Sequence, residues 1–376
     1  MTENILRKRK EIWALYLPQF YETEENNKWW GKGYTEWTSV RAAKPLFDGH
    51  EQPQIPLNQN YYDLSNVEEM RRQAELAKQY GVSNFVMFHY WYEGVHLLEK
   101  PAEQLLEAPD IDFPFCFCWA NHSWTRAWDG KDTEILMEQT YGELEEWEAH
   151  LQYLLPFFRD ARYTKIDNMP VLFIYRAGSI YRADERIEYW NERLREEGFS
   201  GLYVVEYINT FNHKPSLEMS QAVFEDEPNY TCRFELPLIK KAVRLVHKKT
   251  KTIDYQNFDY ICRLMLKKNR TYGGRMIFQG MFGAWDNSPR KGKNSRILTN
   301  ASPEKMQDYL IRLLSSSRSD VSNIVVYNAW NEWGEGAVLE PTEQHGYAYL
   351  EAIRTALAVS NAHSSPDIDC HDDGEQ

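Results

Sequence analysis

The sequence predicts an α/β fold, a closed (β/α)8 barrel of the TIM type with an elaborated segment after its first strand. Apolar, β-branched runs alternate with helical patterns along the chain, which is typical of a parallel sheet with crossover helices. Eight such runs can be counted, and eight parallel strands close on themselves as a barrel. The length of 376 residues is one that such a barrel reaches with insertions in its loops.

Each strand candidate is a short apolar run bounded by polar residues, Gly or Pro. The sixth candidate is short and polar at both ends, so it is the least secure of the set. In chain order the predicted strands span residues 12–18, 84–89, 113–119, 170–175, 201–206, 221–225, 275–281 and 323–327.

Helical patterns fall between these runs. The first helix is predicted to begin with Ser65 as its N-cap, and Glu68 closes a capping box. Gly81 follows the end of the same helix, where glycine is the usual C-cap. The predicted helices span residues 66–80, 143–158, 183–197, 254–267, 303–316 and 345–359.

The amino-acid composition indicates which kinds of molecule the protein binds. The formal net charge of −13 argues against nucleic acid, because binding a polyanion requires a basic surface. Hydrophobic residues make up 43% of the chain, which is enough for a core without a disulfide or metal staple. The 13 Trp and 24 Tyr are unusually many, and we expect the excess to line a carbohydrate cleft.

The five cysteines show no metal-ligand spacing, and Cys116 and Cys118 merely alternate within one predicted strand. They indicate reduced thiols in a cytoplasmic protein, and we expect no metal and no cofactor. No apolar run approaches membrane-spanning length, and residues 12–17 are too short for a signal segment. The expected organisation is a basic tail at residues 1–11, one catalytic barrel domain at 12–359 and a disordered acidic tail at 360–376.

The most informative segment follows the eighth predicted strand and reads Trp-Asn-Glu-Trp-Gly-Glu-Gly at residues 330–336. Paired carboxylates do the acid/base work of glycosidic cleavage, and barrel enzymes carry their sites at the carboxyl ends of their strands. The plainer alternative is a Trp-capped strand end with solvated glutamates, but the strand-end position favours a site. The sequence therefore predicts Glu332 and Glu335 as the catalytic pair.

The segments after other predicted strands carry side chains that fit a sugar. An indole can cover the C–H face of a sugar ring, while amides and carboxylates bind its hydroxyls. Glu36 could equally be a solvated loop carboxylate, His89 could equally be a packing residue, and Glu340 is expected to orient the loop. The predicted substrate-binding residues are Tyr21, Glu36, Trp37, His89, Tyr90, Trp91, Asn121, Trp124, Trp128, Trp285, Asp286, Asn331 and Trp333.

Residues 239–296 are locally basic in an otherwise acidic chain. A solvated helical face is the favoured interpretation. The functional alternative is attraction to anionic lipid headgroups, phosphorylated carriers or acidic glycans, which would allow a weak peripheral contact with a membrane.

The motifs together carry a family resemblance. The chain resembles the WbsX-like proteins of bacterial polysaccharide gene clusters, which are related to glycoside hydrolase family 99, the endo-α-mannosidases. The similarity covers residues 12–358, nearly the whole chain. It rests on Ala-Leu-Tyr-Leu-Pro-Gln-Phe-Tyr at residues 14–21, Gly-Tyr-Thr-Glu-Trp at 33–37, Phe-His-Tyr-Trp at 88–91, Trp-Ala-Asn-His at 119–122 and the motif at 330–336.

This resemblance implies a (β/α)8 barrel, a retaining mechanism and no metal. In family 99 the first carboxylate of the Asn-Glu-Trp-x-Glu-Gly motif acts as base on the sugar's own 2-hydroxyl, and the second is the acid/base at the leaving oxygen. By motif position these residues are Glu332 and Glu335. The WbsX-like branch carries a glycosyltransferase label from its gene context, so mannose specificity does not follow.

The leading hypothesis is a glycoside hydrolase that acts on a bacterial polysaccharide or oligosaccharide. One alternative is a glycosyltransferase or transglycosylase in O-antigen or capsule biosynthesis. Another is a catalytically inactive carbohydrate-binding barrel. All three share a carbohydrate partner.

Overall fold

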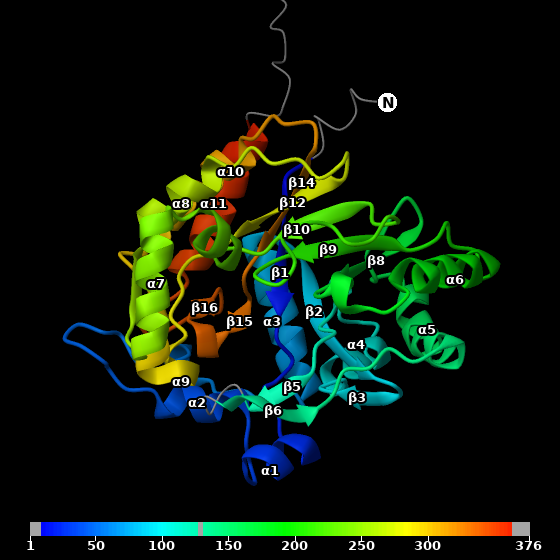
Figure 1. Cartoon of the computed structure of the whole chain (residues 1–376), viewed down its shortest axis with the longest axis horizontal. Helices are drawn as coiled ribbons and strands as arrows, with labels where there is room; N and C mark the ends of the chain where they lie inside the picture. The colour runs from blue at the N-terminus through cyan, green and yellow to red at the C-terminus, as the bar shows by residue number, and fades with distance from the viewer. Residues whose placement is uncertain (1–8, 127–130, 363–376) are drawn as a thin grey trace, which may run out of the picture.

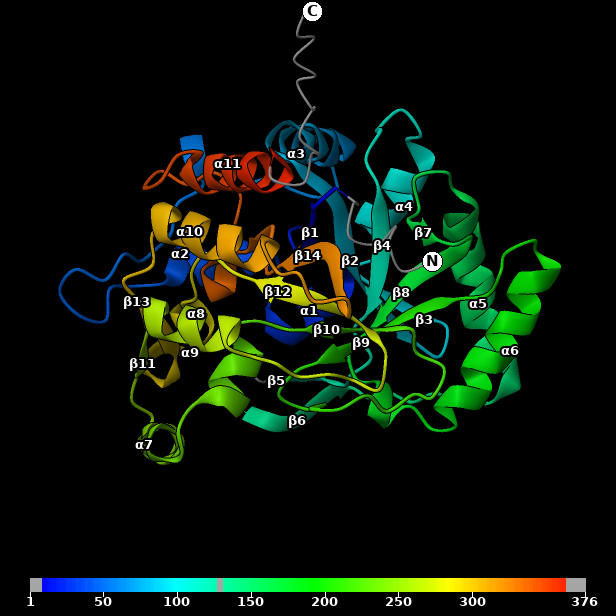
Figure 2. The ribbon, with the colours of Figure 1, turned by 90° about the horizontal axis from the view of Figure 1, so that it is seen from above.

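The computed structural model describes residues 9–126 and 131–362, so most of both predicted tails lies outside the described residues. Eight parallel strands form a closed barrel, because β1 pairs with β14 on one side and with β2 on the other. The strand order around the barrel is β1, β14, β12, β10, β9, β8, β4 and β2. Figure 2 shows the strands at the centre and the larger helices around them. The predicted (β/α)8 fold is confirmed.

All eight predicted strands are present, including the insecure sixth. That strand, β10, is fully buried and pairs in parallel with both β9 and β12. The barrel strands are β1 (Glu11–Tyr16), β2 (Val82–Tyr92), β4 (Phe115–Trp119), β8 (Met169–Ile174), β9 (Tyr203–Ile208), β10 (Ala222–Glu225), β12 (Met276–Met281) and β14 (Val321–Tyr327).

The six predicted helices are present with two corrections, and two further helices, α4 (Lys100–Glu107) and α7 (Leu238–Thr250), were not predicted. Asn66, not Ser65, caps the first barrel helix, because the Asn66 side chain accepts a hydrogen bond from the backbone of Glu68. The predicted helix at 254–267 begins only at Phe258, since the residues before it form a short strand, β11 (Asp254–Asn257), that pairs with β13 (Arg296–Thr299). The larger helices are α3 (Val67–Tyr80), α4 (Lys100–Glu107), α5 (Leu144–Arg159), α6 (Ala183–Glu196), α7 (Leu238–Thr250), α8 (Phe258–Leu266), α10 (Pro303–Leu314) and α11 (Ala348–Ala362).

The carboxyl ends of the barrel strands carry most of the shorter elements. The segment between β1 and α3 is elaborated as predicted and holds two extra helices, which lie in the lower part of Figure 1 with β5 and β6. The shorter helices are α1 (Glu24–Trp30), α2 (Glu36–Ala42), α9 (Ser288–Lys291), the 3-10 turns Leu57–Gln59, Ala177–Ser179, Gly292–Asn294 and Trp333–Glu335, and the π-helical turn Thr231–Glu235. The shorter strands are β3 (Val95–Leu97), β5 (Trp124–Arg126), β6 (Lys131–Met137), β7 (Lys165–Ile166), β15 (Asn331–Glu332) and β16 (Ala337–Val338).

Aromatic rings fill the barrel interior. Trp13 meets Phe278 with ring centroids 5.8 Å apart, and Phe173 lies 6.0 Å from both Phe224 and Phe278. These contacts are edge-to-face, the arrangement that aromatic pairs prefer. Nine of the 13 tryptophans are buried, so most of these indoles pack inside the protein.

The ends of the described chain meet at the amino-terminal side of the barrel. The backbone nitrogen of Lys10, just before β1, donates to the side chain of Asn361 near the end of α11, at 2.9 Å.

Of the cysteines, Cys116, Cys118, Cys232 and Cys262 are buried free thiols. Within residues 9–126 and 131–362, no helix is long and apolar enough to cross a membrane.

A buried ion cluster closes the carboxyl end of β10. Lys268 contacts Glu225 and lies 2.6 Å from a carboxylate oxygen of Glu227. The three side chains are at most 6% exposed. Tyr272 donates a further hydrogen bond to Glu225 at 2.7 Å. Removing one partner from such a cluster leaves the remaining charge buried and unpaired, which is unfavourable.

Lys268→Met should therefore destabilise the protein by about 3–5 kcal/mol, because two buried carboxylates lose their counter-charge. Lys267→Met is the matched control, since Lys267 is the same residue type and is exposed. Urea unfolding of the two variants measures the difference. Equal stability of both variants would show that Lys268 does not neutralise the two glutamates.

Candidate active site

The segment after β14 folds back onto the end of β1. The backbone nitrogen of Trp330 donates to the carbonyl of Leu15 at 2.8 Å. The Asn331 amide accepts from the backbone nitrogen of Leu17 at 2.7 Å and donates to its carbonyl at 2.9 Å. A short hairpin of β15 and β16 continues from there. The motif is thus fixed at the carboxyl end of the barrel. The Asn331 amide forms hydrogen bonds to the backbone just after β1.

Three glutamates from two distant segments meet at one arginine. Arg290, in α9, donates from Nε to Glu36 at 2.8 Å and from Nη2 to Glu332 at 2.8 Å. Its third nitrogen, Nη1, lies 3.0 Å from Glu335. A planar guanidinium with a fixed fork of donors can hold several carboxylates in defined directions. The structure therefore brings the predicted Glu36 together with the predicted pair.

Gly334 makes this meeting possible. A Cβ atom at this position would collide with Glu36 Oε1 and with the guanidinium of Arg290. Only glycine allows the turn between Glu332 and Glu335 to come this close to the arginine. The glycine in the motif is therefore required by the packing of the charged cluster.

Burial governs the protonation of the cluster. Desolvation raises the pKa of Glu332 to about 8, Arg290 opposes this, and the charges of Glu335 and Glu36 raise the pKa further. Burial also acts to lower the pKa of Arg290, but the three carboxylates hold it well above its usual value. Glu335 has the most accessible side chain of the three glutamates, 26% exposed against 0% for Glu36 and 10% for Glu332. At neutral pH the cluster thus contains a cation, a protonated Glu332 and a carboxyl group open to solvent.

A further acidic residue lies beside Glu335. Asp226 follows β10, is 4% exposed and accepts hydrogen bonds from the amides of Asn328, at 3.2 Å, and Asn229, at 3.3 Å. Burial raises the pKa of Asp226 to about 8; the Asn229 hydrogen bond opposes this, while the charge of Glu335 adds to it. A second protonated carboxyl group therefore stands close to the cluster at neutral pH.

Asp286, predicted to bind a hydroxyl, braces the loop. Its carboxylate accepts from Gln52 Nε2 at 2.6 Å and lies 2.7 Å from His50 Nε2. Its backbone nitrogen donates to the carbonyl of Glu335 at 2.7 Å. Asp286 thus connects the segment after β12 to the turn that carries the glutamate pair.

Partly exposed aromatic rings stand near the cluster. Trp124, in β5, has its ring centroid 5.3 Å from Trp29, in α1, and 5.5 Å from Tyr90. Tyr90 is an electrostatic neighbour of Glu332, because burial and then nearby charges including that of Glu332 raise its pKa. Trp29 was not predicted. Trp128 was predicted and lies outside the described residues.

The other predicted tryptophans lie in the core. Trp37 donates from Nε1 to the carbonyl of Tyr62 at 2.7 Å, and its ring centroid is 5.4 Å from that of Trp333. Trp91 stacks on His150 with centroids 4.6 Å apart. Their exposure is at most 6%, and Trp285 and Trp333 are equally buried at 3% and 0%. For these four residues the burial favours packing over sugar stacking.

Three predicted polar residues are also engaged inside the protein. His89 Nε2 lies 2.9 Å from His150 Nε2, and burial lowers the pKa of His89 to about 3, so that it stays neutral. The Asn121 amide accepts from the backbone nitrogen of Arg176 at 2.8 Å and donates to its carbonyl at 2.9 Å. Tyr21 is 5% exposed, and its hydroxyl accepts from the backbone of Lys100 at 3.4 Å.

The sequence analysis missed Arg290 and Asp226. Arg290 lies four residues beyond Asp286, in a segment already recognised as following a strand, but it was counted with the basic surface residues. Asp226 directly follows Glu225, the polar end of the short sixth strand that was judged the least secure. Acidic residues at the end of a barrel strand were the signal that could have identified it.

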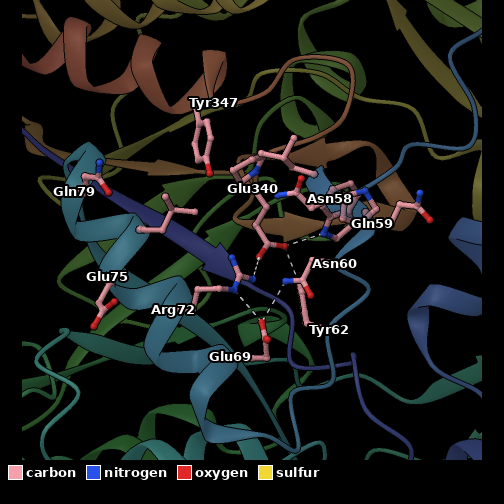
Figure 3. Close-up of a pocket in the computed structure, with 15 residues that line it drawn as sticks. Asn58, Gln59, Asn60, Tyr62, Glu69, Arg72, Glu75, Gln79, Glu340 and Tyr347 are labelled. Carbon is pink, nitrogen blue, oxygen red and sulfur yellow. Dashed lines mark hydrogen bonds and ion pairs between the residues drawn. The ribbon is translucent and has the colours of Figure 1, made fainter.

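A cavity of about 710 Å³ lies on the flank of the motif, between α3 and the segment that precedes α11 (Figure 3). Glu340 projects into it and accepts hydrogen bonds from the hydroxyl of Tyr62, at 2.7 Å, and from Trp333 Nε1, at 2.8 Å. Arg72 of α3 lies 4.0 Å from the other oxygen of Glu340. Glu340 thus fixes the indole of Trp333 from the side of the cavity, as expected for a residue that orients the loop. The cavity is lined by Pro56, Leu57, Asn58, Gln59, Asn60, Tyr62, Glu69, Arg72, Glu75, Leu76, Gln79, Trp333, Glu340, Pro341 and Tyr347.

Truncation should separate the packed indoles from the accessible one. Trp37→Ala and Trp91→Ala should each lose about 3–5 kcal/mol of stability, the usual cost of a large cavity in a core. Trp124→Ala should lose clearly less and instead weaken binding to a panel of glycans. Chemical denaturation and glycan affinity of the three variants provide the measurements. Comparable destabilisation by all three, with unchanged affinity, would assign Trp124 to the core.

Glu332 should make stability depend on pH. Its folded-state pKa of about 8 exceeds the unfolded value of about 4.3. The folded protein therefore holds this proton more tightly, and the resulting stabilisation is present below about pH 4 and is lost as the pH rises to about 8. Because glutamine cannot ionise, the melting temperature of Glu332→Gln relative to wild type should rise between about pH 5 and about pH 8.5.

Glu145→Gln, which alters an exposed glutamate of α5, serves as the control and should show a flat difference over the same range. A flat difference for Glu332→Gln as well would mean that Glu332 is already ionised in the folded protein.

Comparison with known proteins places the chain in a family. The family model described as "Glycosyltransferase WbsX" matches residues 12–353. The "Uncharacterized protein WxcX" of Xanthomonas campestris pv. campestris (strain B100) is 34% identical over 350 residues, which are 92% of this chain and 49% of the relative. The chain thus spans about half the length of the curated relatives it matches.

Solved structures support the fold. The GH99 endo-alpha-mannosidase from Bacteroides thetaiotaomicron, in complex with bis-tris-propane, superposes with a TM-score of 0.54 at 12% identity, covering 94% of this chain and 98% of the mannosidase. A "Glycoside hydrolase-like protein" superposes with a TM-score of 0.60 at 12% identity, covering 95% and 99% of the two chains. By sequence, the chain belongs to the glycosyltransferase WbsX family, and it shares its barrel fold with the GH99 endo-alpha-mannosidase.

Proposed function

We propose that this protein is a glycoside hydrolase that cleaves a bacterial polysaccharide or oligosaccharide with retention of configuration. The observation that carries the proposal is the meeting of Glu36, Glu332 and Glu335 on Arg290 at the carboxyl end of the barrel. Barrel enzymes carry out their chemistry at this end, and paired carboxylates are the usual catalysts of glycosidic cleavage. The half-buried rings of Trp29 and Trp124 offer apolar faces for a sugar at the same end.

The proposed roles follow the motif of family 99. Glu335 has the most accessible carboxyl group, so it can protonate the leaving oxygen and later accept a proton from water. Glu332 would accept the proton of the 2-hydroxyl, whose oxygen attacks the anomeric carbon as the bond to the leaving group breaks. Because burial raises the pKa of Glu332 to about 8, the proton it carries at neutral pH must first pass to water. When water later attacks the anomeric carbon and the bond to the 2-oxygen breaks, Glu332 would return the proton to that oxygen. Arg290, 2.8 Å away, would stabilise the carboxylate that forms.

A glycosyl transfer reaction is the second candidate, and the description of the family favours it. In a transglycosylase the same two carboxylates would serve, with a sugar hydroxyl in place of water. In a transferase the donor would instead be an activated sugar. An inactive carbohydrate-binding barrel would bind a glycan and leave it unchanged.

Incubation with a panel of bacterial glycans, with and without added nucleotide sugars, distinguishes these candidates. Hydrolysis should release reducing sugar without any nucleotide sugar, and prolonged chelation should leave the rate unchanged. Growth of a glycan only when a nucleotide sugar is present would establish a transferase. Binding without turnover in every arm would establish the inactive barrel.

Glu335→Gln should lower turnover by about two to four orders of magnitude while leaving substrate binding intact, because glutamine cannot donate a proton. Glu343→Gln, an exposed glutamate that follows the same loop, is the control and should keep wild-type turnover. Initial rates and glycan affinity of both folded variants give the comparison. Near-normal turnover of Glu335→Gln would exclude Glu335 as the acid.

A further inference from the structure

Helix α7 turns its apolar side toward solvent. Leu238 is 82% exposed, and Leu245 and Val246 are 64% and 60% exposed. Ile239, at 79%, and Val243, at 48%, complete the set. At the helical repeat of 3.6 residues these five side chains fall on one side of the helix. We refer to them as the α7 apolar face.

The opposite side of α7 contacts the protein through polar groups. Lys241 donates from Nζ to the carbonyl of Phe234 at 2.9 Å, and Arg244 donates from Nη1 to the carbonyl of Cys232 at 2.6 Å. A surface helix of a globular protein normally packs its apolar side inward. Here the orientation is reversed, and large contiguous exposed apolar surfaces mark sites of interaction.

The charge of α7 also differs from that of the rest of the chain. Residues 238–251 contain six lysines and arginines and no aspartate or glutamate, in a chain of net charge −13. Lys249 is exposed beside the apolar face, whereas the ammonium of Lys240 lies over the ring of Tyr260 in α8, 4.2 Å from its centroid. The surface therefore combines apolar side chains with positive charge.

The helix is accessible to a large partner. Figures 1 and 2 show α7 at the periphery of the molecule, outside α8 and the barrel strands. Its position leaves the α7 apolar face open along the length of the helix, so that an extended flat surface could reach all of it.

The positive charge of α7 indicates which kind of partner the α7 apolar face binds. Pairing with the α7 of a second copy would bring two strongly basic helices together, which like-charge repulsion disfavours. An anionic membrane surface satisfies both features, because apolar side chains enter the boundary of the acyl region while lysines remain near the lipid phosphates. We propose that α7 is an interfacial helix that binds the protein peripherally to membranes rich in anionic phospholipid. This inference is independent of the reaction that the barrel catalyses.

Vesicle flotation tests the proposal with the full chain. Binding should be strong to vesicles containing phosphatidylglycerol, weak to pure phosphatidylcholine, and should fall as salt is raised. Removal of the charge of Lys249 should lower the partition coefficient by roughly fivefold. Leu245→Glu/Val246→Glu should lower it by at least about tenfold, because two charged groups would have to enter the interface.

Ile135→Glu is the matched control, since Ile135 is a comparably exposed apolar residue, 56%, on β6. This variant should bind vesicles like wild type, and thermal melts should show all variants folded. Absence of wild-type binding to anionic vesicles, or equal binding by Leu245→Glu/Val246→Glu, would overturn the proposal. So would light scattering that shows a dimer abolished by the same double substitution without vesicle binding, because the occupant would then be a second copy.

Discussion

The contact of one guanidinium with three carboxylates is the constraint on which the rest of the site depends. Arg290 can reach Glu36, Glu332 and Glu335 only because α2, α9 and the turn Trp333–Glu335 approach each other closely. That approach depends on Gly334, where a Cβ would occupy the space of the ion pair. Without the arginine, burial of three acidic groups in one place would be strongly unfavourable.

Three polar residues around this cluster hold its motif in a defined position. Asn331 ties the motif to β1, Asp286 ties it to the segment after β12, and Glu340 holds Trp333 from the flanking cavity. Each of these polar side chains forms hydrogen bonds to backbone groups or to other side chains within the protein. Such groups orient functional residues without contacting a ligand, and their loss would loosen the geometry of the pair. Part of the motif and of its neighbouring segments therefore serves to position the glutamates.

The fold was predictable because its signal is repeated. Each of the eight barrel strands is a separate apolar run, so one doubtful member such as β10 did not change the result. The site was predictable only in part. Glu36, Glu332 and Glu335 could be found from their place after strands, but a lysine- and arginine-rich stretch gives no indication that Arg290 turns inward to meet these glutamates.

The sequence could not show which tryptophans are accessible to a sugar, for a related reason. An indole beside polar residues in the sequence can either face a cleft or fill a core, and residue type does not distinguish the two. Trp37 and Trp91 satisfy their indole N–H groups internally, on Tyr62 and Glu146, which allows them to be buried despite polar neighbours. Among the described residues, Trp124 and the unpredicted Trp29 are partly exposed and contact each other.

The meeting of Lys10 with Asn361 has a consequence for how this barrel can be joined to other proteins. Both ends of the described chain lie at the amino-terminal side of the barrel, opposite the glutamate cluster, so a module joined at either end would begin on the side away from that cluster. The WxcX relatives are about twice as long as the region they share with this chain, which shows that the barrel occurs within larger polypeptides. The same geometry makes either end a suitable position for a fluorescent protein or an affinity handle that leaves the site accessible.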